Sequence, residues 1–138
     1  MASEAAGKTP RQIQAMEREK YRREFAAEKA KAVAGRPMSR ARAGELLLRY
    51  LGSYSRLPEI MRFASIMNRR SWLATLGEYW SVSDNLYEWD KHLRRLLPGR
   101  TTLLMIGKDE RAAWQALPDA VTVYRGCSEV NLTGFRGR

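Results

Sequence analysis

The chain has 138 residues, enough for one ordinary domain with a short appendage. Its 25 Lys and Arg residues outnumber 15 Asp and Glu residues, and the resulting net charge of +10 favours polyanionic partners such as nucleic acid, phosphate-bearing cofactors or acidic proteins. A single cysteine, Cys127, excludes an intrachain disulfide, and no apolar run suits a signal peptide or a membrane span, so we expect a soluble cytoplasmic protein without membrane contact.

Residues 1–36 are predicted to form a basic helical arm. The segment from Pro10 to Ala34 is rich in Ala, Glu, Lys, Arg and Gln, which have high helix propensity, and Thr9 followed by Pro10 is typical of a helix start. Its apolar residues form only a thin, broken stripe. Because such a helix has little surface to bury, we expect it to protrude from the rest of the protein.

The charges of this arm allow two interpretations. Its basic residues could neutralise the phosphates of a nucleic acid or bind an acidic protein. Its glutamates, however, are spaced to pair with Arg or Lys three or four positions away, which favours a solvated or partner-binding helix over a nucleic-acid arm. The residues concerned are Arg11, Arg18, Lys20, Arg22, Arg23, Lys29 and Lys31, with Glu17, Glu19, Glu24 and Glu28.

Residues 37–119 are predicted to form a helical domain, because Leu, Ile, Met, Phe and Trp recur there at helical spacing. The aromatic residues of this region are expected to be mainly core, with Trp80 and Trp89 as anchors, rather than a base-stacking surface. The apolar run Thr101 to Ile106 fits a short strand or a loop equally well. The predicted helices begin at Ser39, at Pro58, between Asn68 and Ser71, at Asp84 or Asn85, and at Asp109.

Motifs for metal or nucleotide chemistry are missing from the sequence. One histidine, His92, lies among basic residues of a predicted helix and is expected at the surface, and one cysteine cannot build a zinc site or a Cys/His nucleophile pair. The glycines match neither the phosphate-loop pattern nor the dinucleotide-binding fingerprint. We therefore expect no metal and no nucleotide bound by those routes.

Residues 120–138 begin with the one predicted strand, Val121 to Tyr124, which is β-branched and aromatic and follows a Pro-Asp turn. Arg125 directly follows this predicted strand and precedes Gly126. Such an arginine can be a surface residue at a turn. Alternatively, its fork of donors can clamp a diphosphate, with the glycine allowing close approach of the ligand.

The segment Leu117-Pro118-Asp119 followed by Val121-Thr122-Val123-Tyr124-Arg125-Gly126 resembles the first core strand of ADP-ribosyltransferase-like domains of the Arg-Ser-Glu class in bacterial and phage proteins. The helical region from Trp72 to Asn85 also resembles the part that precedes this strand in a bacterial group of such proteins. The resemblance implies that Arg125 holds the diphosphate and nicotinamide-ribose region of NAD, flanked by Tyr124 and Gly126.

The serine motif and the catalytic glutamate of that class have no counterpart before the sequence ends in Arg136-Gly137-Arg138. The expectation is therefore a truncated, catalytically inactive ADP-ribosyltransferase-like protein with weak or no NAD binding. The alternative is a helical nucleic-acid- or protein-binding module acting through its basic helix. In both cases we predict a mainly α protein: a helical bundle with a protruding N-terminal helix and a short C-terminal β-strand or hairpin that begins an α+β core.

Overall fold

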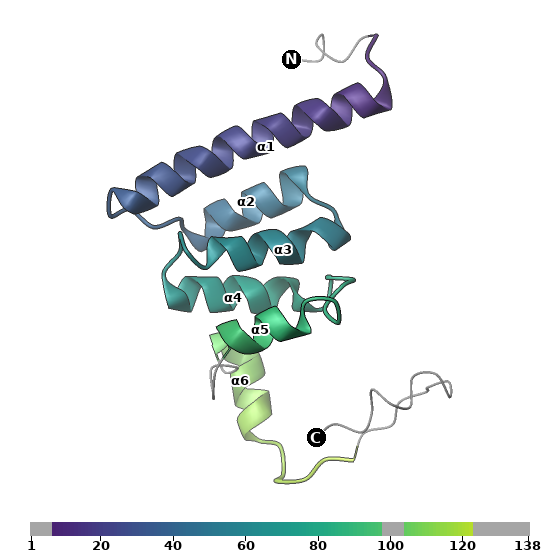
Figure 1. Ribbon diagram of the computed structural model, residues 1–138. Coiled ribbons are helices and arrows are strands. Elements are labelled where there is room, and N and C mark those ends of the chain that lie inside the picture. The colour runs from purple at the N-terminus through teal and green to yellow at the C-terminus, as the bar shows by residue number, and fades with distance from the viewer. Residues whose placement is uncertain (1–6, 98–103, 123–138) are drawn as a thin grey trace. The chain divides into compact units, whose positions relative to one another are not determined.

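The computed structural model describes residues 7–97 and 104–122 and is mainly helical (Figure 1). It divides into two compact units, Met1–Gly107 and Lys108–Arg138. The described part of the first unit contains five helices and that of the second unit contains one. The helices are α1 Pro10–Val33, α2 Arg40–Tyr50, α3 Ser53–Phe63, α4 Arg69–Trp80, α5 Asp90–Leu96 and α6 Lys108–Gln115.

Three predicted helix starts are confirmed by their side-chain caps. Thr9 forms a capping box with Gln12 at the start of α1. Ser39 Oγ accepts a hydrogen bond from the backbone N–H of Arg42, and Asn68 Oδ1 accepts one from that of Ser71. Local sequence therefore sets where α1, α2 and α4 begin.

The end of α1 is set by a glycine. Gly35 has a φ of 84°, a left-handed conformation that residues with a Cβ rarely adopt. The turn there lets the N–H of Arg36 donate to the carbonyl of Lys31 at 2.9 Å, which satisfies a carbonyl of the last helical turn. The predicted break before α2 is thus confirmed.

The predicted start of α3 at Pro58 is wrong, because Pro58 lies inside the helix. A proline in that position has no N–H for the carbonyl of Tyr54, four residues earlier. The side-chain Nδ2 of buried Asn85 donates to this carbonyl instead, at 3.0 Å. The tertiary contact therefore compensates for the hydrogen bond that proline removes.

The predicted helix start at Asp84 or Asn85 is also wrong. Residues 81–89 form turns, and α5 begins at Asp90. Asn85 is buried beside α3, so its amide serves the α3 backbone rather than the start of a new helix. The prediction failed because a capping residue can equally serve a distant carbonyl.

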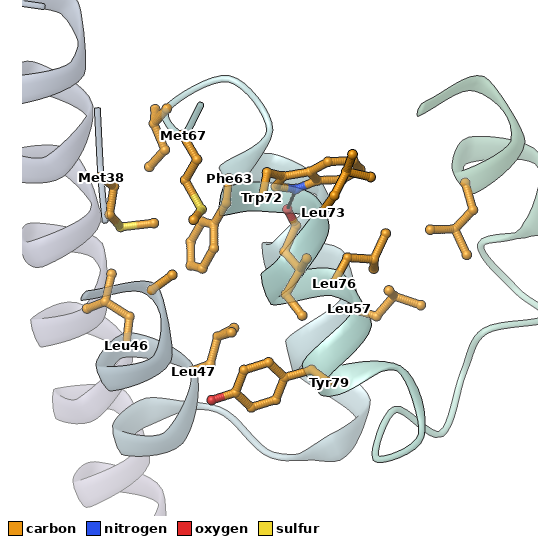
Figure 2. Packing of buried hydrophobic residues seen from close by; sticks show 14 of the residues in the cluster. Met38, Leu46, Leu47, Leu57, Phe63, Met67, Trp72, Leu73, Leu76 and Tyr79 are labelled. Atoms are coloured by element: carbon orange, nitrogen blue, oxygen red, sulfur yellow. Dashed lines mark hydrogen bonds between the residues drawn. The ribbon is translucent and has the colours of Figure 1, made fainter. Parts of the chain in front are cut away.

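The core of the first unit lies among α2, α3 and α4 (Figure 2). Trp72 of α4 is 1% exposed, and its Nε1–H donates to the carbonyl of Ile60 at 2.6 Å. A Cβ placed on Gly77 would lie 1.6 Å from the carbonyl oxygen of Met105, so this glycine allows the 104–107 segment to pass directly against α4. Other fully buried side chains are Ala43, Leu46, Leu47, Leu57, Ile60, Phe63, Leu73, Thr75 and Leu76.

The aromatic residues divide between core and surface, and one prediction about them needs correction. Trp89 packs partly buried against the core, as expected of an anchor, but Trp80 is 36% exposed. Trp72 and Tyr79 already occupy the buried face of α4, and Trp80, one residue past Tyr79, is rotated by about 100° away from it. Tyr87 and Trp114 are also exposed.

From Tyr21 onward, α1 packs against the other helices of the first unit and lies beside α2 (Figure 1). Tyr21 is 7% exposed, and its ring lies 6.1 Å from that of Phe25, which stacks on Phe63 of α3 at 6.0 Å. The Tyr21 hydroxyl donates to Glu59 Oε2 at 2.6 Å. The predicted protrusion of this helix is therefore wrong for its second half, which the thin apolar stripe is sufficient to dock, while residues 10–15 at its start are exposed.

No strand occurs in residues 7–97 or 104–122. The predicted strand begins at Val121 and continues into residues 123–138, which lie outside the described part of the chain. Leu104 to Ile106 form a turn, and the remainder of that apolar run is likewise outside the description.

Candidate nucleic-acid interface

The exposed face of α1 is strongly basic. All seven of its basic residues are exposed, whereas Glu19 is the only exposed glutamate among its four. Glu17 and Glu24 are half-buried, and Glu28 is 4% exposed. The fold thus turns most of the acidic residues of α1 toward the domain and leaves its seven basic residues facing solvent.

Arg42 of α2 holds two of the inner glutamates. Its Nη2 lies 2.7 Å from Glu24 Oε2 and its Nε lies 3.1 Å from Glu28 Oε1, while its Nη1 reaches Glu45 of the same helix at 2.7 Å. The Tyr50 hydroxyl also donates to Glu24, and Lys31 Nζ contacts Glu28 at 2.9 Å. This cluster fixes which way α1 faces.

The cluster keeps its charges at neutral pH. The hydrogen bond from Tyr50 and those from Arg42 lower the pKa of Glu24. Burial opposes ionisation of Glu28, but hydrogen bonds from Lys31 and Arg42 outweigh it and lower the pKa of that carboxyl as well. Hydrogen bonds to Glu45, Glu24 and Glu28 raise the pKa of Arg42.

The predicted pairing of glutamates within α1 is correct for three of the four. Glu17 pairs with Lys20 at 3.7 Å, Glu19 with Arg23 at 3.3 Å, and Glu28 with Lys31. For Glu24 the prediction is wrong, since its partners Arg42 and Tyr50 lie on α2. The sequence signal for this was available, because Glu17, Glu24 and Glu28 share the helical phase of Tyr21.

Four basic residues form one row along α1: Arg11, Arg18, Arg22 and Lys29. Their separations of seven, four and seven residues place them on the same side of a helix with 3.6 residues per turn. Arg11, Arg18 and Lys29 form no ion pair with any described residue, and Arg22 has only a 4.0 Å contact with Glu19. The row therefore presents guanidinium and ammonium donors that the fold does not use.

The other predicted site falls outside the description. Tyr124, Arg125 and Gly126 belong to residues 123–138, so the geometry of an NAD-binding strand stays a prediction. His92 is exposed at the surface, as expected, with its ring 5.4 Å from that of Trp89.

In the described ranges no group of three or more His, Cys, Asp or Glu residues is placed to hold a metal ion. None of the helices in those ranges combines the length and the apolar character needed to cross a membrane.

Comparison with family models, curated proteins and solved structures found no match.

Proposed function

We propose that the protein binds nucleic acid through the exposed face of α1. The observation that supports this most directly is the exposure of seven basic residues against one acidic residue on that helix. The pairing of glutamates with neighbouring basic residues had favoured a merely solvated helix. In the fold such pairs occupy Lys20, Arg23 and Lys31, but Arg11, Arg18 and Lys29 have no ion pair with a described residue, which weakens that objection.

The binding would be mainly electrostatic. Basic side chains that contact phosphates release condensed counterions, so affinity falls as salt rises. Arginine suits this contact because its planar fork of donors matches a phosphate. Docking of α1 by Tyr21, Phe25 and Arg42 holds its row of cations in place, which lowers the entropy cost of binding.

The test is a pair of variants with the same change in net charge. In the first, Arg11, Arg18, Arg22 and Lys29 are replaced by Gln. In the control, the exposed residues Arg70, Lys91, Arg94 and Arg95, which lie outside α1, are replaced by Gln. Affinity for a fluorescent DNA oligonucleotide is measured by anisotropy between 50 and 200 mM salt, and circular dichroism checks that both variants keep their helices.

We expect the α1 variant to bind about 30-fold or more weakly at low salt. The magnitude of the slope of log K against log salt should fall by about three. The control should lose only about twofold to threefold through the change in net charge. Equal losses in the two variants would reject α1 as the binding surface.

The sequence motif at residues 117–126 supports a second candidate function. We propose that this segment is the entry strand of an ADP-ribosyltransferase-like core, with Arg125 contacting the NAD diphosphate and Tyr124 and Gly126 at its sides. A lone arginine supplies ground-state contacts only, so we expect NAD binding no tighter than about millimolar and no cleavage of the glycosidic bond. Saturation-transfer NMR with NAD tests this.

The NAD signal should disappear in Arg125→Ala and persist in the control Arg136→Ala. Binding in the micromolar range that is insensitive to Arg125→Ala would contradict the proposal.

A further inference from the structure

A second set of basic residues on α1 lies on the other side of its exposed surface from the row of Arg18, Arg22 and Lys29. Lys20, Arg23 and Lys31 are 48%, 77% and 52% exposed at their side chains. With 3.6 residues per turn, Lys20 and Lys31 lie about a quarter-turn to one side of the outward direction, and Arg23 lies between them and that direction. The row of Arg18, Arg22 and Lys29 lies about a quarter-turn to the other side.

Small side chains occupy the ridge between the two rows. Ala15, Ala26 and Ala30 are exposed there, directly opposite the docked face that carries Tyr21 and Glu28. Glu19, the one carboxylate on this ridge, is engaged by Arg23 at 3.3 Å and by Arg22 at 4.0 Å. The outer surface of α1 is thus a narrow ridge with cations along both edges.

We infer that the ligand is B-form duplex DNA, with α1 seated in the major groove and one row of cations facing each phosphate strand. This rests on the proposed function. The major groove is about 12 Å wide and admits a helix of about 10–12 Å diameter. The stretch from Arg18 to Lys31 covers about 20 Å along the helix axis.

The arrangement distinguishes this ligand from other polyanions. The major groove of A-form RNA is too deep and narrow to admit a helix. A single strand supplies only one line of phosphates, and proteins that bind it combine a basic groove with stacked aromatic residues. The outer surface of α1 has no aromatic residue, since Tyr21 and Phe25 point into the domain.

The ridge carries mainly Ala, Gln and one Glu, and Arg23 beside it is paired with Glu19 at 3.3 Å, so few side chains are placed to read base edges. Binding is therefore expected to depend on the shape and phosphates of the duplex and little on its sequence.

The experiment compares the two rows on four ligands: a 20-base-pair DNA duplex, its single strand, the matching RNA duplex and polyglutamate. The variants are Arg18→Gln with Lys29→Gln for one row, and Lys20→Gln with Arg23→Gln for the other. Lys31 is left in place because it contacts buried Glu28. The control, Lys91→Gln with Arg95→Gln, removes the same charge from α5.

We expect each row variant to lose about tenfold in affinity for duplex DNA and the control about twofold or less. The wild-type protein should prefer duplex DNA to the other three ligands. Methyl green, which occupies the major groove, should displace it, whereas netropsin, a minor-groove ligand, should not.

Loss of affinity in only one row variant, or equal binding of the single strand or the RNA duplex, would overturn the groove inference and leave the proposed function standing. Preference for polyglutamate would overturn both. Row variants that behave like the control would reject the proposed function, and the inference with it.

Discussion

Arg42 pairs with three carboxylates, more than any other basic side chain in the described ranges. It reaches Glu24 and Glu28 of α1 and Glu45 of its own helix, and Glu28 is almost completely covered. Each of these contacts is charge-assisted, and the planar guanidinium fits several carboxylates at once. The same residue thereby determines which face of α1 meets solvent.

Replacing Arg42 by Ala should destabilise the protein by about 3 kcal/mol, because it leaves a buried carboxylate with only Lys31 as partner. Urea denaturation followed by circular dichroism measures the change. Arg40→Ala serves as the control, since Arg40 has one exposed ion pair with Glu78 and should cost less than about 1 kcal/mol. Similar losses for the two substitutions would show that the cluster does not anchor α1.

Helix α3 contains a proline and remains a single helix from Ser53 to Phe63. An interior proline removes one backbone hydrogen bond and disturbs the preceding turn. Here the orphaned carbonyl of Tyr54 accepts from Asn85, a residue 31 positions away. The turn segment 81–89 is therefore part of what makes α3 continuous.

A double-mutant cycle on Pro58 and Asn85 tests this coupling. Asn85→Ala should cost about 1–2 kcal/mol in the Pro58 background, because the Tyr54 carbonyl then loses the partner of a part-buried hydrogen bond. In the Pro58→Ala background the alanine N–H can serve that carbonyl, so the cost should fall by about 1 kcal/mol. An Asn85→Ala cost that is the same in both backgrounds would show that the amide acts elsewhere.

At the scale of the whole molecule, the docking of α1 is coupled to pH. Glu24 and Glu28 both have a pKa below their ordinary value of 4.5 in the folded protein. Carboxyls with a lowered folded pKa contribute stability that is complete above their unfolded pKa and is lost as pH falls through the folded value.

We therefore expect the unfolding temperature to be steady near neutral pH and to drop as pH falls below about 4.5, most of the drop occurring between that value and the lowered pKa values. Thermal melts from pH 7 to pH 3 measure it. The combined substitution Glu24→Gln and Glu28→Gln should lower stability at pH 7 and flatten the acid-induced drop. An unchanged acid profile in that variant would mean that other carboxyls control the transition.

The sequence predicted much of the helical architecture because its signals there are local. Thr9 and Ser39 cap helices wherever their neighbours are helix formers, and Gly35 ends α1 because only glycine turns easily with positive φ. The predictions at Pro58, at Asn85 and at Trp80 failed where the decisive contact came from a distant residue or from the rotation of a helix about its axis.

The candidate interface shows the same division. The sequence by itself determined that residues 10–33 form a helix and that this helix carries seven basic and four acidic side chains. Only the tertiary structure decided which of those charges face solvent, because burial of Tyr21 and Phe25 fixes the rotation of α1 and Arg42 draws Glu24 and Glu28 inward. Composition is a property of the chain, whereas a charged surface exists only once packing has chosen one face of a helix over the other.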